Sequence, residues 1–346
     1  MKKIYFLLPV ILLFCLPAEA KIFRVGYNGT PLKGVDYTTI TEANDSAKVG
    51  DTIQIYGSQI YGTIKKRLVI LGFGYNLIAH PGLQSNPGLQ SNATDNLSYI
   101  TYLNFELGSD SSIVEGCYLS AASISSNKVI IRRCAGNVTL YNYEFGVNDI
   151  KIYSCFNFSV AMQWQINLPT YGYPCKNIQI YNSIGSYMTL YGNESNGSII
   201  NCVNSYPNAE NAKILIKNSI GSFQPGGNNI WNNNIFSNNE PTPALSGMNN
   251  KFAQAYDSIF VTPNPDPSIG GLDENNYQLR ANSPAKNFGF NLSGNPTDCG
   301  IFGGELAYRY KIGGQPAIPA FYKLSAPTNS ASSNPYNITV SVRSNN

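Results

Sequence analysis

A short element recurs along the middle of the chain, and it constrains the fold more than any other feature. It consists of an apolar residue, a variable residue, a small residue or Asn, then Cys or Ser, then an apolar residue. Seven copies, the last less regular, begin at Val114, Ile131, Ile152, Ile180, Ile199, Ile216 and Trp231. Successive copies start 17, 21, 28, 19, 17 and 15 residues apart. A fixed unit with variable spacing predicts stacked turns of a solenoid that are joined by loops of different lengths.

Each copy of the element has the pattern of a short strand. Segments such as 150–152, 178–180 and 214–216 have Ile at the first and third residues, which would share one buried face, while the middle residue points to the opposite face. The spacing is too short for a βαβ unit, which needs about 30 residues or more. Strands that pair with the same strand of the next coil, about 4.8 Å away, fit the spacing. We therefore predict an all-β parallel β-helix of about 12 coils or fewer, with few helices.

Two positions of the element suggest how each coil turns. The fourth position holds small side chains, which we expect to point into the tube: Cys117, Cys134, Cys155, Ser183, Cys202, Ser219 and Asn234. The third position ends in four asparagines: Asn182, Asn201, Asn218 and Asn233. Asn tolerates the left-handed backbone of a sharp corner, and stacked amides can hydrogen-bond along a column.

The N-terminus has the pattern of a secretory signal peptide over residues 1–20. Lys2 and Lys3 precede a 13-residue apolar stretch, and an Ala-Glu-Ala sequence ends at Ala20. We expect the protein to be secreted or held at the outer cell surface, with no transmembrane segment once the signal is cleaved. The net charge is +3, and cleavage would remove Lys2, Lys3 and Glu19 and leave +2. This charge gives no reason to expect a nucleic-acid partner.

Six cysteines remain after residue 20. Four of them occupy the fourth position of the element, so we expect buried free thiols that pack as small apolar groups. The sequence leaves open a disulfide between Cys175 and Cys299. No metal site is predicted, because there is no Cys-x-x-Cys pair and His80 is the only histidine.

Both ends of the chain resemble a known family. The segment Tyr37-x-x-Ile40-x-x-Ala43, followed by Gly50-Asp51-Thr52-Ile53, is similar to the N-terminal cap and first coils of secreted right-handed parallel β-helix proteins of the pectate-lyase-like superfamily, Bacteroidetes type. Thr38 or Thr39 would cap a short helix there. Residues 276–304 resemble the closing segment of that family. After the signal peptide (1–20), the resemblance implies a right-handed β-helix with cap and closing segment (21–316) and a C-terminal strand tail (317–346).

Enzymes of this superfamily gather carboxylates on one face, either around Ca²⁺ with a basic residue or as an acid and base pair. The acids of this chain do not recur at the same position of neighbouring copies. The weak catalytic candidates are Arg132, Arg133, Lys151 and Glu115. Glu115 lies one coil from Arg132, and we expect a solvated ion pair between the coils rather than a catalytic pair. No cofactor is predicted, and Ca²⁺ would be needed only by a lyase.

The second position of the element is more suggestive of binding. Tyr153 and Tyr181 should be stacked neighbours on the outside of the tube, in one column with Lys217 and Asn232. Exposed tyrosine rings beside amides and an ammonium group are suited to a glycan, although stacked tyrosines can also simply stabilise a strand surface.

The sequence therefore favours a non-catalytic protein that binds polysaccharide or a cell-surface glycan, or acts in adhesion. One alternative is a polysaccharide lyase or glycoside hydrolase that acts on acidic glycans. A second alternative is a structural shaft that has no ligand.

Overall fold

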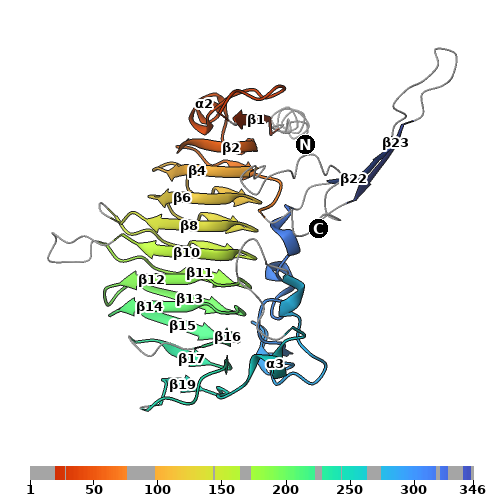
Figure 1. Cartoon of the computed structure of the whole chain (residues 1–346). Helices are drawn as coiled ribbons and strands as arrows, with labels where there is room; N and C mark the ends of the chain where they lie inside the picture. The colour runs from red at the N-terminus through yellow and green to blue at the C-terminus, as the bar shows by residue number, and fades with distance from the viewer. Residues whose placement is uncertain are drawn as a thin grey trace, which may run out of the picture.

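The computed structural model describes residues 20–27, 29–75, 98–142, 145–163, 173–222, 228–242, 244–262, 274–316, 320–325 and 338–343. The chain forms a parallel β-helix, in which short strands stack as the coils of a tube (Figure 1). Seventeen strands belong to one continuous sheet that folds around the tube. The predicted fold class is confirmed.

One face of the tube, here called the odd face, is built from the odd-numbered strands and the start of β2. Each strand pairs in parallel with the next. The strands are β1 (Ile22–Tyr27), β2 (Thr52–Ile64), β3 (Val69–Leu71), β5 (Ile113–Glu115), β7 (Ile130–Arg132), β9 (Lys151–Tyr153), β11 (Ile178–Tyr181), β13 (Asn196–Ile200), β15 (Lys213–Lys217), β17 (Ile230–Asn232) and β19 (Gly247–Met248). The register places like residues on like, since Ile152, Ile180 and Ile199 are successive partners.

A second face, here called the even face, is built from the rest of β2 and the even-numbered strands. They are β4 (Ser98–Phe105), β6 (Tyr118–Ile124), β8 (Ala135–Leu140), β10 (Phe156–Met162), β12 (Tyr187–Tyr191) and β14 (Tyr206–Glu210). These strands are also parallel and pair in sequence order. A short third line joins β16 (Ile220–Gly221) to β18 (Ile235–Phe236) and continues as isolated bridges such as Ile184 to Val203.

The corner after each odd-face strand uses the left-handed backbone that was predicted for the asparagines. The residue there has a φ between +42° and +73° in eight successive coils: Gly116, Arg133, Ser154, Asn182, Asn201, Asn218, Asn233 and Asn249. Its N–H donates to a carbonyl of the next coil, as from Asn201 to Lys217 at 3.0 Å. Arg133 and Ser154 adopt the same conformation, although such side chains rarely do.

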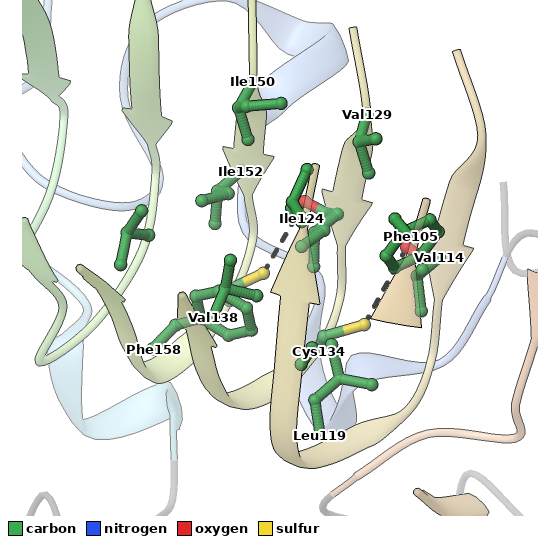
Figure 2. Packing of buried hydrophobic residues seen from close by; sticks show 14 of the residues in the cluster. Phe105, Val114, Leu119, Ile124, Val129, Cys134, Val138, Ile150, Ile152 and Phe158 are labelled. Atoms are coloured by element: carbon green, nitrogen blue, oxygen red, sulfur yellow. Dashed lines mark hydrogen bonds between the residues drawn. The ribbon is translucent and has the colours of Figure 1, made fainter. Parts of the chain in front are cut away.

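The fourth position of the element points into the tube, as predicted, and all seven of its residues are buried. The six cysteines after residue 20 are free thiols and are buried, so no bridge joins Cys175 to Cys299. In Cys134, Cys155 and Cys202 the Sγ contacts a carbonyl one coil earlier, as in Cys134 to Val114 at 3.8 Å (Figure 2). Where it holds Ser, its Oγ accepts the N–H of the coil before, as in Cys155 to Ser183 at 3.1 Å. The column thus packs and hydrogen-bonds between coils.

A helix closes the N-terminal end of the tube. The helix α2 (Ile40–Ser46) is capped by Thr39, whose side chain accepts the N–H of Glu42 while the Glu42 carboxylate accepts the N–H of Thr39. Hydrogen bonds to the Glu42 carboxylate lower its pKa, first that of the Thr39 side chain and then those of the backbone N–H groups of Thr39 and Thr38. Ile40 and Ala43 are buried against the first coils. The other end of the helix is held by Lys66, whose Nζ donates to the carbonyls of Asn44 and Ala47.

The C-terminal part of the chain folds back along the outside of the tube. Residues 285–316, here called the strap, follow the helix α3 (Tyr256–Ile259) and the 3₁₀ helix η3 (Glu274–Tyr277). They contain β20 (Gly289–Phe290), β21 (Pro296–Thr297) and the 3₁₀ helices η4 (Leu306–Tyr308) and η5 (Ile312–Gly314). The strap runs beside the stacked coils in Figure 1. A last antiparallel hairpin pairs β22 (Ala320–Ser325) with β23 (Thr339–Arg343).

Corner side chains hold the strap along its length. The Nδ2 of Asn182 donates to the carbonyls of Ile301 and Gly303, both at 2.8 Å. The same kind of bond joins Asn233 to Phe288, Asn218 to Phe290, Asn201 to Asp298, Ser154 to Arg309 and Arg133 to Gln315. The strap therefore crosses the coils in reverse order. Among the described corner asparagines, the one recorded amide-to-amide bond runs from Asn218 to Asn201 at 3.3 Å.

The strap also covers a second apolar core. The fifth position of the element points out of the tube, and residues such as Phe156, Ile184 and Val203 are fully buried there. They form a cluster with Ile301 and Tyr310 of the strap. This cluster lies apart from the cluster that fills the tube. The first position of the element therefore packs inside the tube, whereas the fifth position packs outside it, beneath the strap.

Candidate functional site

Three of the four weak catalytic candidates meet in one buried ion cluster. The Glu115 carboxylate lies 2.6 Å from Nη2 of Arg132 and 2.9 Å from Nη1 of Arg133. Arg132 also donates to the Tyr153 hydroxyl at 3.0 Å. Burial opposes the charge on Arg132, but the hydrogen bond that it donates to Tyr153 and the attraction of Glu115 outweigh burial and raise the pKa of Arg132. The cluster is thus a charge network between three coils.

The expectation of a solvated ion pair is wrong for this cluster, because Glu115 is only 1 % exposed. Its charge is balanced by two guanidinium groups, one of which also holds the strap at Gln315. The Glu115 carboxylate therefore has a structural role, since it pairs with the arginines that join the coils and the strap. Lys151 is half-buried on the same strand as Tyr153, two residues from it, and the structure records no ion pair between Lys151 and the described carboxylates.

The two predicted tyrosines are in register, but the strap covers Tyr181. Tyr153 and Tyr181 are Cα partners in neighbouring strands, as expected. Tyr308 of the strap stacks on Tyr181, with ring centroids 4.6 Å apart, and meets the Tyr153 ring edge to face at 5.2 Å. Tyr181 is only 9 % exposed, and its burial raises the pKa of its hydroxyl. The expectation of an exposed ring is therefore wrong for Tyr181.

The remaining two predicted binding residues lie further along the same column. The Asn232 Oδ1 accepts the N–H of Met248 at 3.1 Å, which helps to seat the last strand of the odd face. Lys217 is half-buried and is the Cα partner of Asn232. Its ammonium group has no recorded ion pair or hydrogen bond within the described part of the chain. The structure therefore leaves Lys217 as the candidate of this column that is available to a ligand.

A small cleft opens where the strap leaves this column. Its volume is about 130 Å³, and Tyr181, Lys217, Glu305 and Tyr308 are among the residues that line it. Two of the four predicted binding residues, Tyr181 and Lys217, are thus brought to one cleft, while Tyr153 and Asn232 lie outside it. The strap residues of the cleft carried no local signal in the sequence, because they are about 75 to 125 residues from the strands they face.

The even face presents a different surface, which the sequence pattern did not single out. One outward column follows the register across seven strands: Thr63, Asn104, Ser123, Thr139, Ala161, Thr189 and Asn208. A parallel column has Tyr61 and Tyr102 near the N-terminal end, and Asn137, Ser159, Tyr187 and Tyr206 further along. Tyr61, Tyr102 and Tyr187 are each about half exposed, at 55 %, 45 % and 49 %. The face is thus a flat array of small hydroxyl and amide groups flanked by exposed tyrosines.

Many carboxylates of the described residues are occupied by backbone N–H groups. Asp51 accepts the N–H groups of Lys21 and Lys48, and its pKa is lowered by the bond from Lys48 above all. Glu274 is buried and accepts the N–H of Gly313. No group of three His, Cys, Asp or Glu side chains that could hold a metal occurs within the described ranges.

The fold and its corner pattern define the molecule as a parallel β-helix protein. No protein-family model, no curated protein and no solved structure matches the chain. In the part of the chain that the structure describes, none of the helices has the length and apolar character needed to cross a membrane.

Proposed function

We propose that the protein is a secreted or cell-surface polysaccharide-binding protein, without catalytic activity, and that a glycan chain lies across its even face. The single observation that carries this proposal is the in-register column across seven strands, which holds Thr, Ser or Asn in six of them and Ala161 in the other, beside exposed tyrosines. We also propose that the chain is a member of the pectate-lyase-like superfamily and that residues 1–20 are a signal peptide.

The chemistry of the even face suits a sugar polymer. Hydroxyl and amide groups both donate and accept hydrogen bonds, as sugar hydroxyls do. Exposed tyrosine rings give flat apolar surfaces with a polar edge. Neighbouring strands are about 4.8 Å apart, so equivalent groups recur at a fixed interval along the tube. A repeating polymer can make the same contact at several coils, and weak contacts then add up.

The state of the acids favours binding over cleavage. Glycoside hydrolysis needs two carboxyl groups about 5 to 9.5 Å apart across the bond that breaks. In this chain Glu115 is neutralised by two arginines, and Glu274, Asp51 and Glu42 accept backbone N–H groups. The outward positions of the even-face array hold hydroxyl, amide and methyl groups. A lyase or hydrolase acting on acidic glycans remains the competing function, and a ligand-free shaft is the third.

Affinity electrophoresis of the purified protein in gels that contain acidic or neutral polysaccharides tests the proposal. At least one polymer should retard the protein, and the double variant Tyr61→Ala/Tyr187→Ala should migrate freely in it. Tyr173→Ala is the matched control, since Tyr173 is equally exposed at 51 % but lies outside the strands of the even face. Loss of retardation in the control as well would contradict the assigned face.

The same polymers, incubated with the protein with and without Ca²⁺, separate the alternatives. Release of unsaturated or reducing sugars would make the protein an enzyme and overturn the proposal. Absence of both retardation and release across the panel would favour the shaft.

A further inference from the structure

We propose that the cleft between the strap and the odd face is a second binding site, which takes a ring-sized sugar acid with its carboxylate against Lys217. The even face and this cleft are built from different elements, and the inference does not depend on the function proposed for the even face. The argument uses the size of the cleft, its walls and its two charged groups.

The size of the cleft admits one ring. Its volume is about 130 Å³. In another protein, an engineered apolar cavity of about 150 Å³ binds benzene, so this cleft has room for about one six-membered ring. A site of this size at a seam between two elements selects a monomer or the terminal unit of a chain.

The walls are mostly apolar and are fixed in place. The apolar or aromatic side chains that line the cleft are Tyr181, Ile200, Leu215, Phe290, Leu292 and Tyr308. Tyr308 is stacked on Tyr181, and the strap that carries it is held by Asn182 and Asn201 on the same stretch of coils. The cleft is therefore formed before a ligand arrives, and little ordering opposes binding.

Lys217 supplies a positive charge that the described residues leave unpaired. Two other half-buried amines have acceptors, since Lys66 donates to three carbonyls near the end of α2 and Lys251 donates to the Pro284 carbonyl. Lys151 and Lys311 are also half-buried without a recorded partner among the described residues, but neither lines the cleft. Lys217 is half-buried beside apolar walls, and it has no recorded acceptor among the described residues. The Glu305 carboxylate lines the same cleft, but no ion pair joins it to Lys217 among the described residues. A partly desolvated ammonium group without an ion-pair partner favours an anion placed directly beside it.

Glu305 restricts the kind of anion. It lines the same cleft, and its Oε1 accepts the N–H of Leu292 at 2.9 Å. A carboxylate has several acceptor positions, so Glu305 can also accept hydrogen bonds from ligand hydroxyls. A ligand that carries one carboxylate and several hydroxyls on a ring satisfies both side chains. A neutral sugar lacks the anion for Lys217, and benzoate lacks the donors for Glu305.

Ligand-observed NMR titration of the purified protein with glucuronate, glucose and benzoate tests the assignment. Glucuronate should bind, and Lys217→Gln should weaken its binding by about tenfold or more, as expected for loss of one charge-assisted hydrogen bond. Lys217→Arg should restore most of it. The matched control is Lys213→Gln, since Lys213 is exposed on the same strand but does not line the cleft. This control should bind as the wild type does.

Three results would overturn the inference. They are no binding of glucuronate to the wild type, equal binding of glucose or benzoate, and equal losses in the Lys217 and Lys213 variants. The even-face variant Tyr61→Ala/Tyr187→Ala should bind glucuronate normally, so failure at one site is distinguishable from failure at the other. Circular dichroism of each variant checks that the fold is intact.

Discussion

Replacement of Asn182 by Ala should detach the middle of the strap and destabilise the whole molecule. Asn182 is 1 % exposed, has a φ of +42°, and donates to two strap carbonyls at 2.8 Å. Loss of two buried hydrogen bonds, with both acceptors left unpaired, should cost about 2 to 4 kcal/mol. An alanine in the left-handed conformation should add about 1 kcal/mol. We therefore expect a loss of about 3 to 5 kcal/mol in the free energy of unfolding.

Two further variants separate the backbone contribution from the strap contribution. Asn182→Gly relieves the conformational strain and should be about 1 kcal/mol less damaging than alanine. Asn249→Ala is the matched control, because Asn249 has a φ of +56° at the same corner of the last coil but is exposed. It should lose only about 1 kcal/mol.

Equilibrium urea unfolding, followed by circular dichroism, measures these differences. Limited proteolysis should also cut the strap of Asn182→Ala faster than that of Asn249→Ala. Equal losses at Asn182 and Asn249 would refute the reasoning, since the strap bonds would then contribute nothing. Full recovery in Asn182→Gly would show that the backbone alone is responsible.

Three more perturbations follow from the structure. Glu115→Gln leaves two arginines without their counter-charge and should cost about 3 to 5 kcal/mol in urea unfolding, whereas Glu194→Gln, at an exposed ion pair, should cost less than about 1 kcal/mol; similar losses would contradict the role of burial. Gly136→Ala places Cβ 1.8 Å from a backbone carbonyl oxygen at a φ of +119° and should abolish soluble folding, whereas Gly294→Ala, at φ +79° in open space, should lose only about 1 kcal/mol; comparable soluble yields would show that the strand can shift. Burial raises the pKa of Cys202 to about 12, so its neutral thiol stabilises the fold fully below the unfolded pKa of about 9 and loses about 1.4 kcal/mol per pH unit as pH rises from there toward 12. The urea midpoint should therefore fall between these limits, and less steeply in Cys202→Ala; an identical pH dependence would exclude a contribution from this thiol.

The coils could be predicted because the same residue pattern recurs in each of them. The inward Cys and Ser column, the left-handed Asn corners and the Tyr153–Tyr181 register all depend on contacts between neighbouring coils. Those contacts are about 15 to 28 residues apart and recur, so a pattern reveals them. The N-terminal cap was predictable for a related reason, since the Thr39 and Glu42 capping box is local.

The strap could not be predicted, because its contacts occur once and over long distances in the chain. Asn182 reaches Gly303 across 121 residues, and Arg133 reaches Gln315 across 182. The sequence therefore predicts the left-handed corners and adds amide stacking for the asparagines, but it does not predict their bonds to the strap, and it predicts an exposed surface for Tyr181. One signal was present: the fifth position of the element is apolar in every copy, and an apolar column outside a filled tube requires a cover.

The strap also changes how the coils depend on one another. In a simple solenoid each unit contacts only its neighbours, so ends can fray while the middle stays folded. Here one segment binds the coils of Asn233, Asn218, Asn201, Asn182, Ser154 and Arg133 in turn. Its docking sites exist only after those coils have stacked, and the segment is synthesised after all of them. We therefore expect the strap to dock only on a fully stacked set of coils. We also expect it to couple distant coils, so that they unfold together rather than one by one.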